Sequence, residues 1–163
     1  MAAVSSPNHQ AGVAWHSTRR RLTVARASRY LGALAVLATG VAHIEQYAVD
    51  NYSTVPTIGT LFLLNFIAAV VLAVGLVVPL GRIAGRYADA VRAVIAVAAI
   101  GLGVLSLVAL FVSETSGLFG FVEHGYRMAI VSAIVAEAAA VVFLITFLVA
   151  NGTALQSMRR RSL

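Results

Sequence analysis

Residues 57–80 read TIGTLFLLNFIAAVVLAVGLVVPL and contain no charged side chain. The hydrocarbon core of a bilayer is about 30 Å thick, which an α-helix crosses in about 20 residues. Helices are favoured there because they satisfy their own backbone hydrogen bonds without water. Pro56 stands just before the stretch, where a missing N–H group costs little at a helix start. The sequence therefore predicts a transmembrane helix over residues 57–80.

Three further apolar stretches flank this one, at residues 30–48, 91–112 and 128–150. The stretch at 30–48 is just long enough to cross a bilayer, whereas the other two are clearly long enough. The last stretch is dense in alanine, and small side chains let helices approach closely in lipid. The predicted fold class is all-α, a transmembrane four-helix bundle formed by residues 29–150.

Composition supports a lipid environment. The chain has 163 residues, of which 60% are hydrophobic and 11% are charged, and its mean hydropathy is +0.91. Soluble domains carry about 25% charged residues to cover their surface in water. The absence of cysteine excludes disulfides, thiol catalysis, thiolate metal sites and covalent haem attachment through CxxC.

Arginine placement predicts the orientation in the membrane. The net charge is +6 and all twelve basic residues are arginine. Eleven of them would lie on one side, in the two terminal segments and between the second and third spans, and only Arg127 on the other. Cytoplasmic loops carry the excess of basic residues, so both termini are expected in the cytoplasm of a bacterial plasma membrane, N-in/C-in.

The terminal segments 1–28 and 151–163 are expected to be basic cytoplasmic tails, the first of them disordered because it has few apolar residues to bury. Nucleic acid is not an expected partner, since the arginines flank apolar spans without interleaved aromatic residues. The expected partners are membrane lipids, and either further copies of the chain or a larger membrane complex.

Glu137 is the ionisable residue deepest in a predicted span. A charged side chain at the bilayer centre costs at least about 2.5–3.5 kcal/mol, so such residues are commonly functional. Glu137 would serve either as a proton or cation carrier in a proton-coupled transporter, or as a neutral acid that hydrogen-bonds a neighbouring helix. Asn65 in the second span is its candidate partner.

His43 lies near the external end of the first span and shares a helical face with Gln46 and Tyr47. The second external segment supplies polar residues that this face could meet. With Asn65 and Glu137 included, the candidate ligand-binding residues are His43, Gln46, Tyr47, Asn65, Glu123, His124, Arg127 and Glu137.

Four interpretations of this set stay open. His43 and His124 would ligate a haem b iron, with Arg127 near a propionate. The same histidines with neighbouring carboxylates would bind a divalent metal. His43 and Tyr47 would hydrogen-bond a quinone or another apolar ligand in a cleft. The fourth interpretation is a hydrogen-bonded polar cap that fixes the external loops.

Residues 40–52 and 55–65, together with 113–121 and 123–125, resemble small four-span integral membrane proteins of actinobacteria. The resemblance covers residues 30–150, and alanine, valine and arginine usage is typical of a GC-rich genome. The layout is also similar in architecture to DoxX-like proteins. Neither resemblance implies an activity.

No nucleophile–base pair or cofactor fingerprint is present, so a non-enzymatic role is favoured. The leading hypothesis is an accessory, scaffold or small-ligand-binding protein with an outward-facing polar site. The alternatives are a haem- or quinone-linked redox protein that uses His43 and His124, and a proton-coupled transporter that uses Glu137.

Overall fold

The computed structural model describes residues 7–122 and 127–159, and in this part of the chain the elements are helices. The long ones are α1 (Pro7–Ala48), α2 (Ile58–Val77), α4 (Ala88–Thr115) and α5 (Met128–Arg159). The short ones are η1 (Tyr52–Thr54), α3 (Leu80–Ile83) and η2 (Gly85–Tyr87). The all-α prediction is confirmed.

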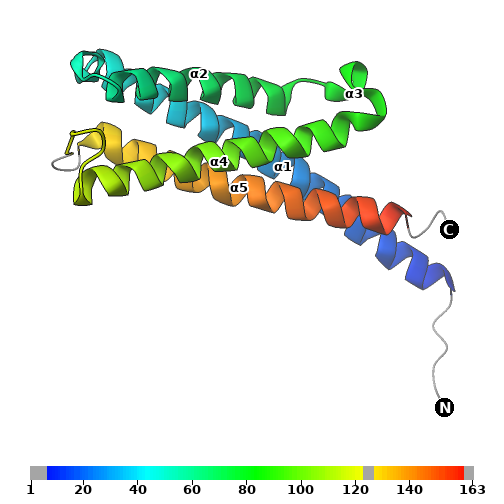
Figure 1. The fold of residues 1–163 in the computed structure, drawn as a ribbon. Helices are drawn as coiled ribbons and strands as arrows, with labels where there is room; N and C mark the ends of the chain where they lie inside the picture. The colour runs from blue at the N-terminus through cyan, green and yellow to red at the C-terminus, as the bar shows by residue number, and fades with distance from the viewer. Residues whose placement is uncertain (1–6, 123–126, 160–163) are drawn as a thin grey trace.

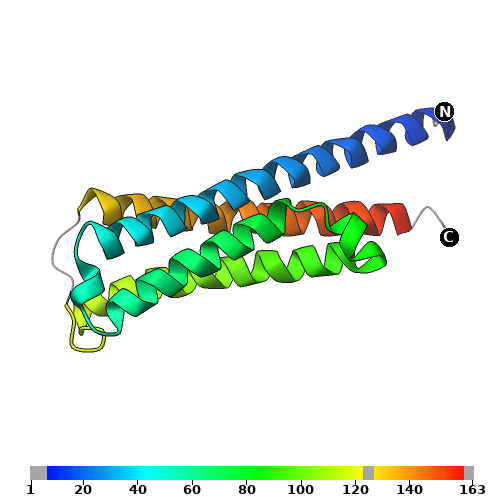
Figure 2. The ribbon, with the colours of Figure 1, turned by 90° about the horizontal axis from the view of Figure 1, so that it is seen from above.

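The four long helices run alongside one another, with α1 and α5 behind α2 and α4 in Figure 1. The N-terminal end of α1 and the C-terminal end of α5 lie towards the same end of the bundle as α3 in both Figure 1 and Figure 2. We call this the α3 end, and the opposite one, which carries η1 and residues 116–122, the η1 end. Each long helix contains a stretch that is long and apolar enough to cross a membrane.

The helix boundaries follow local chemistry. α2 ends at Val77 because a residue that precedes proline is disfavoured in helical conformation, and Pro79 follows Val78 in extended conformation. The predicted stretches 91–112 and 128–150 lie within α4 and α5, which extend beyond them.

The prediction of a disordered segment at residues 1–28 is corrected from Pro7 onward, where α1 is already helical. At the other terminus, α5 continues to Arg159, so residues 151–159 of the expected tail are helical too. Alanine and arginine are strong helix formers. Packing also extends this far, because Ala25 belongs to the hydrophobic core and Ala154 is fully buried.

The core is built mainly from small residues, while larger apolar side chains face outward. The deeply buried alanines include Ala69, Ala96, Ala99, Ala140 and Ala154. Exposed large residues occur on every long helix and include Leu34, Val71, Val94, Leu105 and Val142. This arrangement is typical of helices that associate in lipid, where close backbone approach and dispersion drive packing instead of the hydrophobic effect.

Glycines mark the closest approaches of α1 to its neighbours. A Cβ atom placed on Gly32 would meet Cδ2 of Leu144 in α5 at 2.5 Å, and one on Gly40 would meet Cβ of Ala69 in α2 at 2.9 Å. Both distances are shorter than van der Waals contact. α1 is therefore held tightly against α5 and α2, and α1–α5 is the most extensive helix pair of the bundle.

Candidate functional site

A cavity of about 390 Å³ lies in the half of the bundle nearest the η1 end. Its sides are formed by the first half of α2 and the second half of α4, and α1 and α5 close its back. The apolar lining residues are Ile58, Leu61, Phe62, Leu64, Ala68, Leu102, Leu105, Ala109, Leu110, Leu118, Phe121, Ile130 and Ala133. Its size and apolar walls are those of a small-molecule site.

The cavity reaches the outer surface of the bundle between α2 and α4. Three leucines that line it are also exposed on that surface, Leu61 by 41%, Leu64 by 54% and Leu105 by 69%. These residues lie in the stretches of α2 and α4 that are apolar enough to span a membrane. The cavity therefore opens to the outer surface of the bundle past these leucines.

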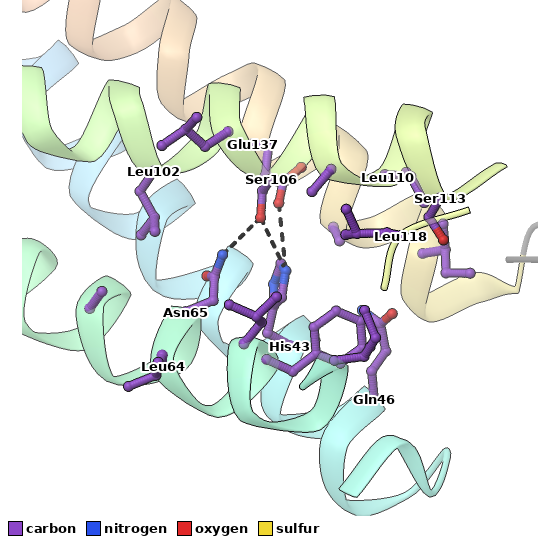
Figure 3. Close-up of a pocket in the computed structure, with 18 of the residues that line it drawn as sticks. His43, Gln46, Leu64, Asn65, Leu102, Ser106, Leu110, Ser113, Leu118 and Glu137 are labelled. Carbon is purple, nitrogen blue, oxygen red and sulfur yellow. Dashed lines mark hydrogen bonds and ion pairs between the residues drawn. The ribbon is translucent and has the colours of Figure 1, made fainter. Parts of the chain in front are cut away.

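Four polar side chains meet at the back of the cavity, one from each long helix (Figure 3). Asn65 Nδ2 on α2 donates a hydrogen bond to Ser106 Oγ on α4 at 2.8 Å. Ser106 Oγ lies 3.3 Å from Nε2 of His43 on α1. Glu137 on α5 places Oε1 3.9 Å from the same Nε2 atom. We call these residues the polar cluster.

Backbone geometry fixes the tautomer of His43. Its Nδ1 atom lies 2.9 Å from the carbonyl oxygen of Thr39, one turn earlier in α1. A carbonyl only accepts hydrogen bonds, so Nδ1 carries a proton, and Nε2 of the neutral ring is an acceptor. His43 and Glu137 are both almost completely buried, at 6% and 3% exposure. The cluster therefore presents a nitrogen lone pair beside a carboxyl group, away from bulk water.

Aromatic rings close the cavity at the η1 end. Tyr52 of η1 is buried, with its ring centroid 4.9 Å from that of Phe62 and 5.5 Å from that of Phe121. Phe62 in turn stands edge-on to the His43 imidazole at 5.2 Å. A side chain on Gly59 would overlap the backbone oxygen of Tyr52, so this glycine lets η1 lie directly on the first turn of α2.

Arg127 holds this closure from the rim. It donates a hydrogen bond to the Tyr52 hydroxyl group, its guanidinium lies 5.2 Å from the centroid of the Tyr52 ring, and Nη1 lies 3.6 Å from Oδ2 of Asp50. The Arg127 side chain is 46% exposed, so solvent partly screens its ion pair with Asp50.

The structure brings together four of the eight predicted site residues: His43, Gln46, Asn65 and Glu137 all line the cavity. Gln46 is buried and donates from Nε2 to the Ala42 carbonyl oxygen at 3.1 Å.

Of the other four predicted residues, Tyr47 and Arg127 lie outside the cavity lining. Tyr47 is half-buried and does not line the cavity, which removes it from the predicted hydrogen-bonding pair with His43. Arg127 lies at the rim with Tyr52. Glu123 and His124 lie outside the described residues. The predicted pairing of Asn65 with Glu137 is indirect, because Ser106 is the partner of Asn65.

Two serines of α4 were not predicted as site residues. The hydroxyl group of Ser106 contacts both Asn65 and His43 in the polar cluster. Ser113 lines the cavity nearer the η1 end. Ser106 is the one hydroxyl-bearing residue in the apolar stretch 91–112, so its position was visible in the sequence.

Among the described residues, no group of three or more histidines, cysteines or carboxylates is placed to hold a metal ion. Comparison of the chain with protein-family models, curated proteins and solved structures found no match.

Proposed function

We propose that this chain is a non-enzymatic plasma-membrane protein that binds a small apolar ligand entering its cavity from the bilayer. The observation that carries the proposal is a lateral, leucine-walled cavity that ends in the polar cluster of His43, Asn65, Ser106 and Glu137. Apolar walls with a few convergent polar groups are typical of sites that bind and orient small molecules.

The proposed orientation puts both termini in the cytoplasm and the cavity in the outer half of the membrane. The described arginines of α1, α3, η2 and α5 lie towards the α3 end, together with Arg92 in the first turns of α4, whereas Arg127 lies at the η1 end. This distribution fits the excess of basic residues on cytoplasmic loops.

The ligand would bind with its apolar part against the leucines and its polar head at the cluster. A buried polar group without a partner costs about 1–3 kcal/mol, so the cluster favours a ligand head that forms hydrogen bonds with it. The aromatic closure formed by Tyr52, Phe62 and Phe121 would separate the head from the external water.

Photo-crosslinking in lipid nanodiscs tests this proposal. An alkyl diazirine probe is expected to label residues inside the cavity, such as Ala68 and Leu110, in addition to lipid-facing residues. Ala109→Phe fills the cavity from α4, and we expect it to abolish labelling inside the cavity while labelling of the lipid-facing residues persists.

The matched control is Val104→Phe, on the same helix but outside the cavity lining. This variant is expected to label like the unmodified protein. Labelling of Ala68 and Leu110 that is equal in the Ala109→Phe protein and the unmodified protein would contradict the proposal.

A second candidate is proton-coupled transport through Glu137. The observation that favours it is the buried approach of Glu137 to Nε2 of His43 at 3.9 Å, which would let one proton move between a carboxyl group and an imidazole. In proteoliposomes with an imposed pH gradient, Glu137→Gln should abolish a proton flux that the unmodified protein supports. Absence of any such flux in the unmodified protein would exclude this candidate.

A further inference from the structure

The polar cluster has more hydrogen-bond acceptors than donors. The hydroxyl of Ser106 has one proton, and it accepts the amide proton of Asn65. That single hydroxyl proton cannot serve both Nε2 of His43 and the carboxyl group of Glu137, although the Ser106 oxygen is a neighbour of both. At least one of these two groups therefore has an acceptor site that Ser106 does not fill.

Asn65 adds a further acceptor. Its Oδ1 atom is buried and has no hydrogen-bond partner among the described residues, although the residue lines the cavity. A proton shared between His43 and Glu137 supplies one additional donor, which still leaves this carbonyl oxygen without a partner. The second N–H of the Asn65 amide is one more donor, but the unfilled acceptors on His43, Glu137 and Asn65 still outnumber the donors.

We infer that the ligand of this cavity donates a hydrogen bond from a neutral hydroxyl group, as a membrane-soluble alcohol or phenol does. This inference rests on the proposed ligand-binding function and names the class of ligand. A ketone, quinone or ether, which only accepts hydrogen bonds, would leave the Asn65 carbonyl oxygen unpaired.

The walls argue against charged ligand heads. An ammonium group would have to leave water for a leucine-walled cavity, which is costly for an ion that is not fully paired. A carboxylic acid could donate a proton, but its ionised form would lie beside Glu137 and repel it. A neutral hydroxyl meets neither cost, and its proton matches the unfilled acceptors.

Competition against the diazirine probe in nanodiscs tests the inference with matched compounds. para-Hexylphenol should displace the probe from the cavity about fivefold more effectively than para-hexylanisole, because one hydrogen bond is worth about 1 kcal/mol. para-Hexylacetophenone, an acceptor of similar length, should behave like the anisole. Dodecanol compared with its methyl ether shows whether aliphatic alcohols share the preference.

Variants locate the preference in the cluster. Asn65→Leu keeps the approximate volume of the side chain and should reduce the ratio between phenol and anisole, whereas Asn65→Asp should preserve it, because a carboxyl group at this position still accepts. Glu137→Gln, which replaces a carboxyl group of the cluster by an amide with two N–H donors, provides a second reduction of the ratio if Asn65→Leu does not fold. Val104→Phe, outside the cavity, should leave the ratio unchanged.

The outcomes separate the two proposals. Equal displacement by the phenol, the anisole and the acetophenone would overturn the inference and leave ligand binding intact. An unchanged ratio in both Asn65→Leu and Glu137→Gln would also overturn it. If no compound displaces the probe and Ala109→Phe has no effect on labelling, the proposed function itself fails.

Discussion

The two sides of the bundle are built differently. Along the seam between α1 and α5, Gly32 allows Leu144 of α5 to lie against the α1 backbone, and Leu144 is completely buried. Between α2 and α4, the large residues Leu64 and Leu105 are exposed on the outer surface and a cavity remains behind them. The α2–α4 contact is also much less extensive than the α1–α5 contact.

This difference shows how one small bundle can be both stable and open. Helices in lipid associate where small residues let backbones approach, and the seam supplies such residues. On the α2–α4 side, the connection through α3 and η2 holds the two helices together at one end, and their other halves flank the cavity. The seam should therefore determine stability, and the α2–α4 side should determine binding.

The sharpest way to break the seam is Gly32→Val. Its Cβ would meet the Cδ2 and Cγ atoms of Leu144 at 2.5 and 2.8 Å, and Leu144 is completely buried. We expect a loss of about 3 kcal/mol in the free energy of unfolding, at the upper end for overpacked sites. Unfolding in mixed micelles with increasing SDS measures it.

Gly101→Val on α4 is the control, because a Cβ at that glycine meets nothing within 4 Å. Its unfolding free energy should stay within about 0.5 kcal/mol of the unmodified protein, as is usual for surface substitutions. Equal losses at the two glycines would contradict the distinction between seam and open side.

A leucine pair sharpens the comparison with a smaller effect. Leu144→Ala on the seam should cost about 2 kcal/mol, the low end for buried leucines, because in the proposed membrane setting lipid and not water would solvate the separated helices. Leu105→Ala, at 69% exposure on the cavity rim, should cost less than about 0.5 kcal/mol. The same unfolding assay checks both, and a larger loss for Leu105→Ala would reverse the assignment of the two sides.

The smallest expected change in stability is at the polar cluster. Ser106→Ala removes the hydroxyl that joins Asn65 and His43, and interhelical hydrogen bonds in membranes average about 0.6 kcal/mol. Ser132→Ala on α5 is the control, because Ser132 is exposed and bonds only the Ala129 carbonyl of its own helix. A loss above about 2 kcal/mol for Ser106→Ala would show that the cluster is chiefly structural.

The helices were largely predictable from the sequence, because apolar length alone marks a membrane-spanning helix. The prediction failed at residues 7–28, where few apolar side chains suggested disorder. Continuity with an already formed helix extends such a segment at little cost, since only helix nucleation is unfavourable. Charge and hydropathy patterns do not indicate how far a formed helix extends beyond its apolar stretch.

Part of the site was predictable because buried polar residues in apolar stretches are rare. His43, Asn65 and Glu137 stood out individually for this reason. Their meeting point did not, because helix rotation and packing order decide which faces converge. Ser106 was overlooked because a single serine is inexpensive within a span, and only the partners around it show its role.

α1 is a continuous helix of 42 residues, about 63 Å long at a rise of 1.5 Å per residue, roughly twice the thickness of a hydrocarbon core. The middle of this rod carries the arginines from Arg19 to Arg29, and its C-terminal end carries His43 and Gln46. An unbroken rod transmits torque, since no proline or glycine pair interrupts it between these positions. A force on the arginine-bearing segment would therefore be passed along the helix towards the imidazole and its neighbours in α2 and α5.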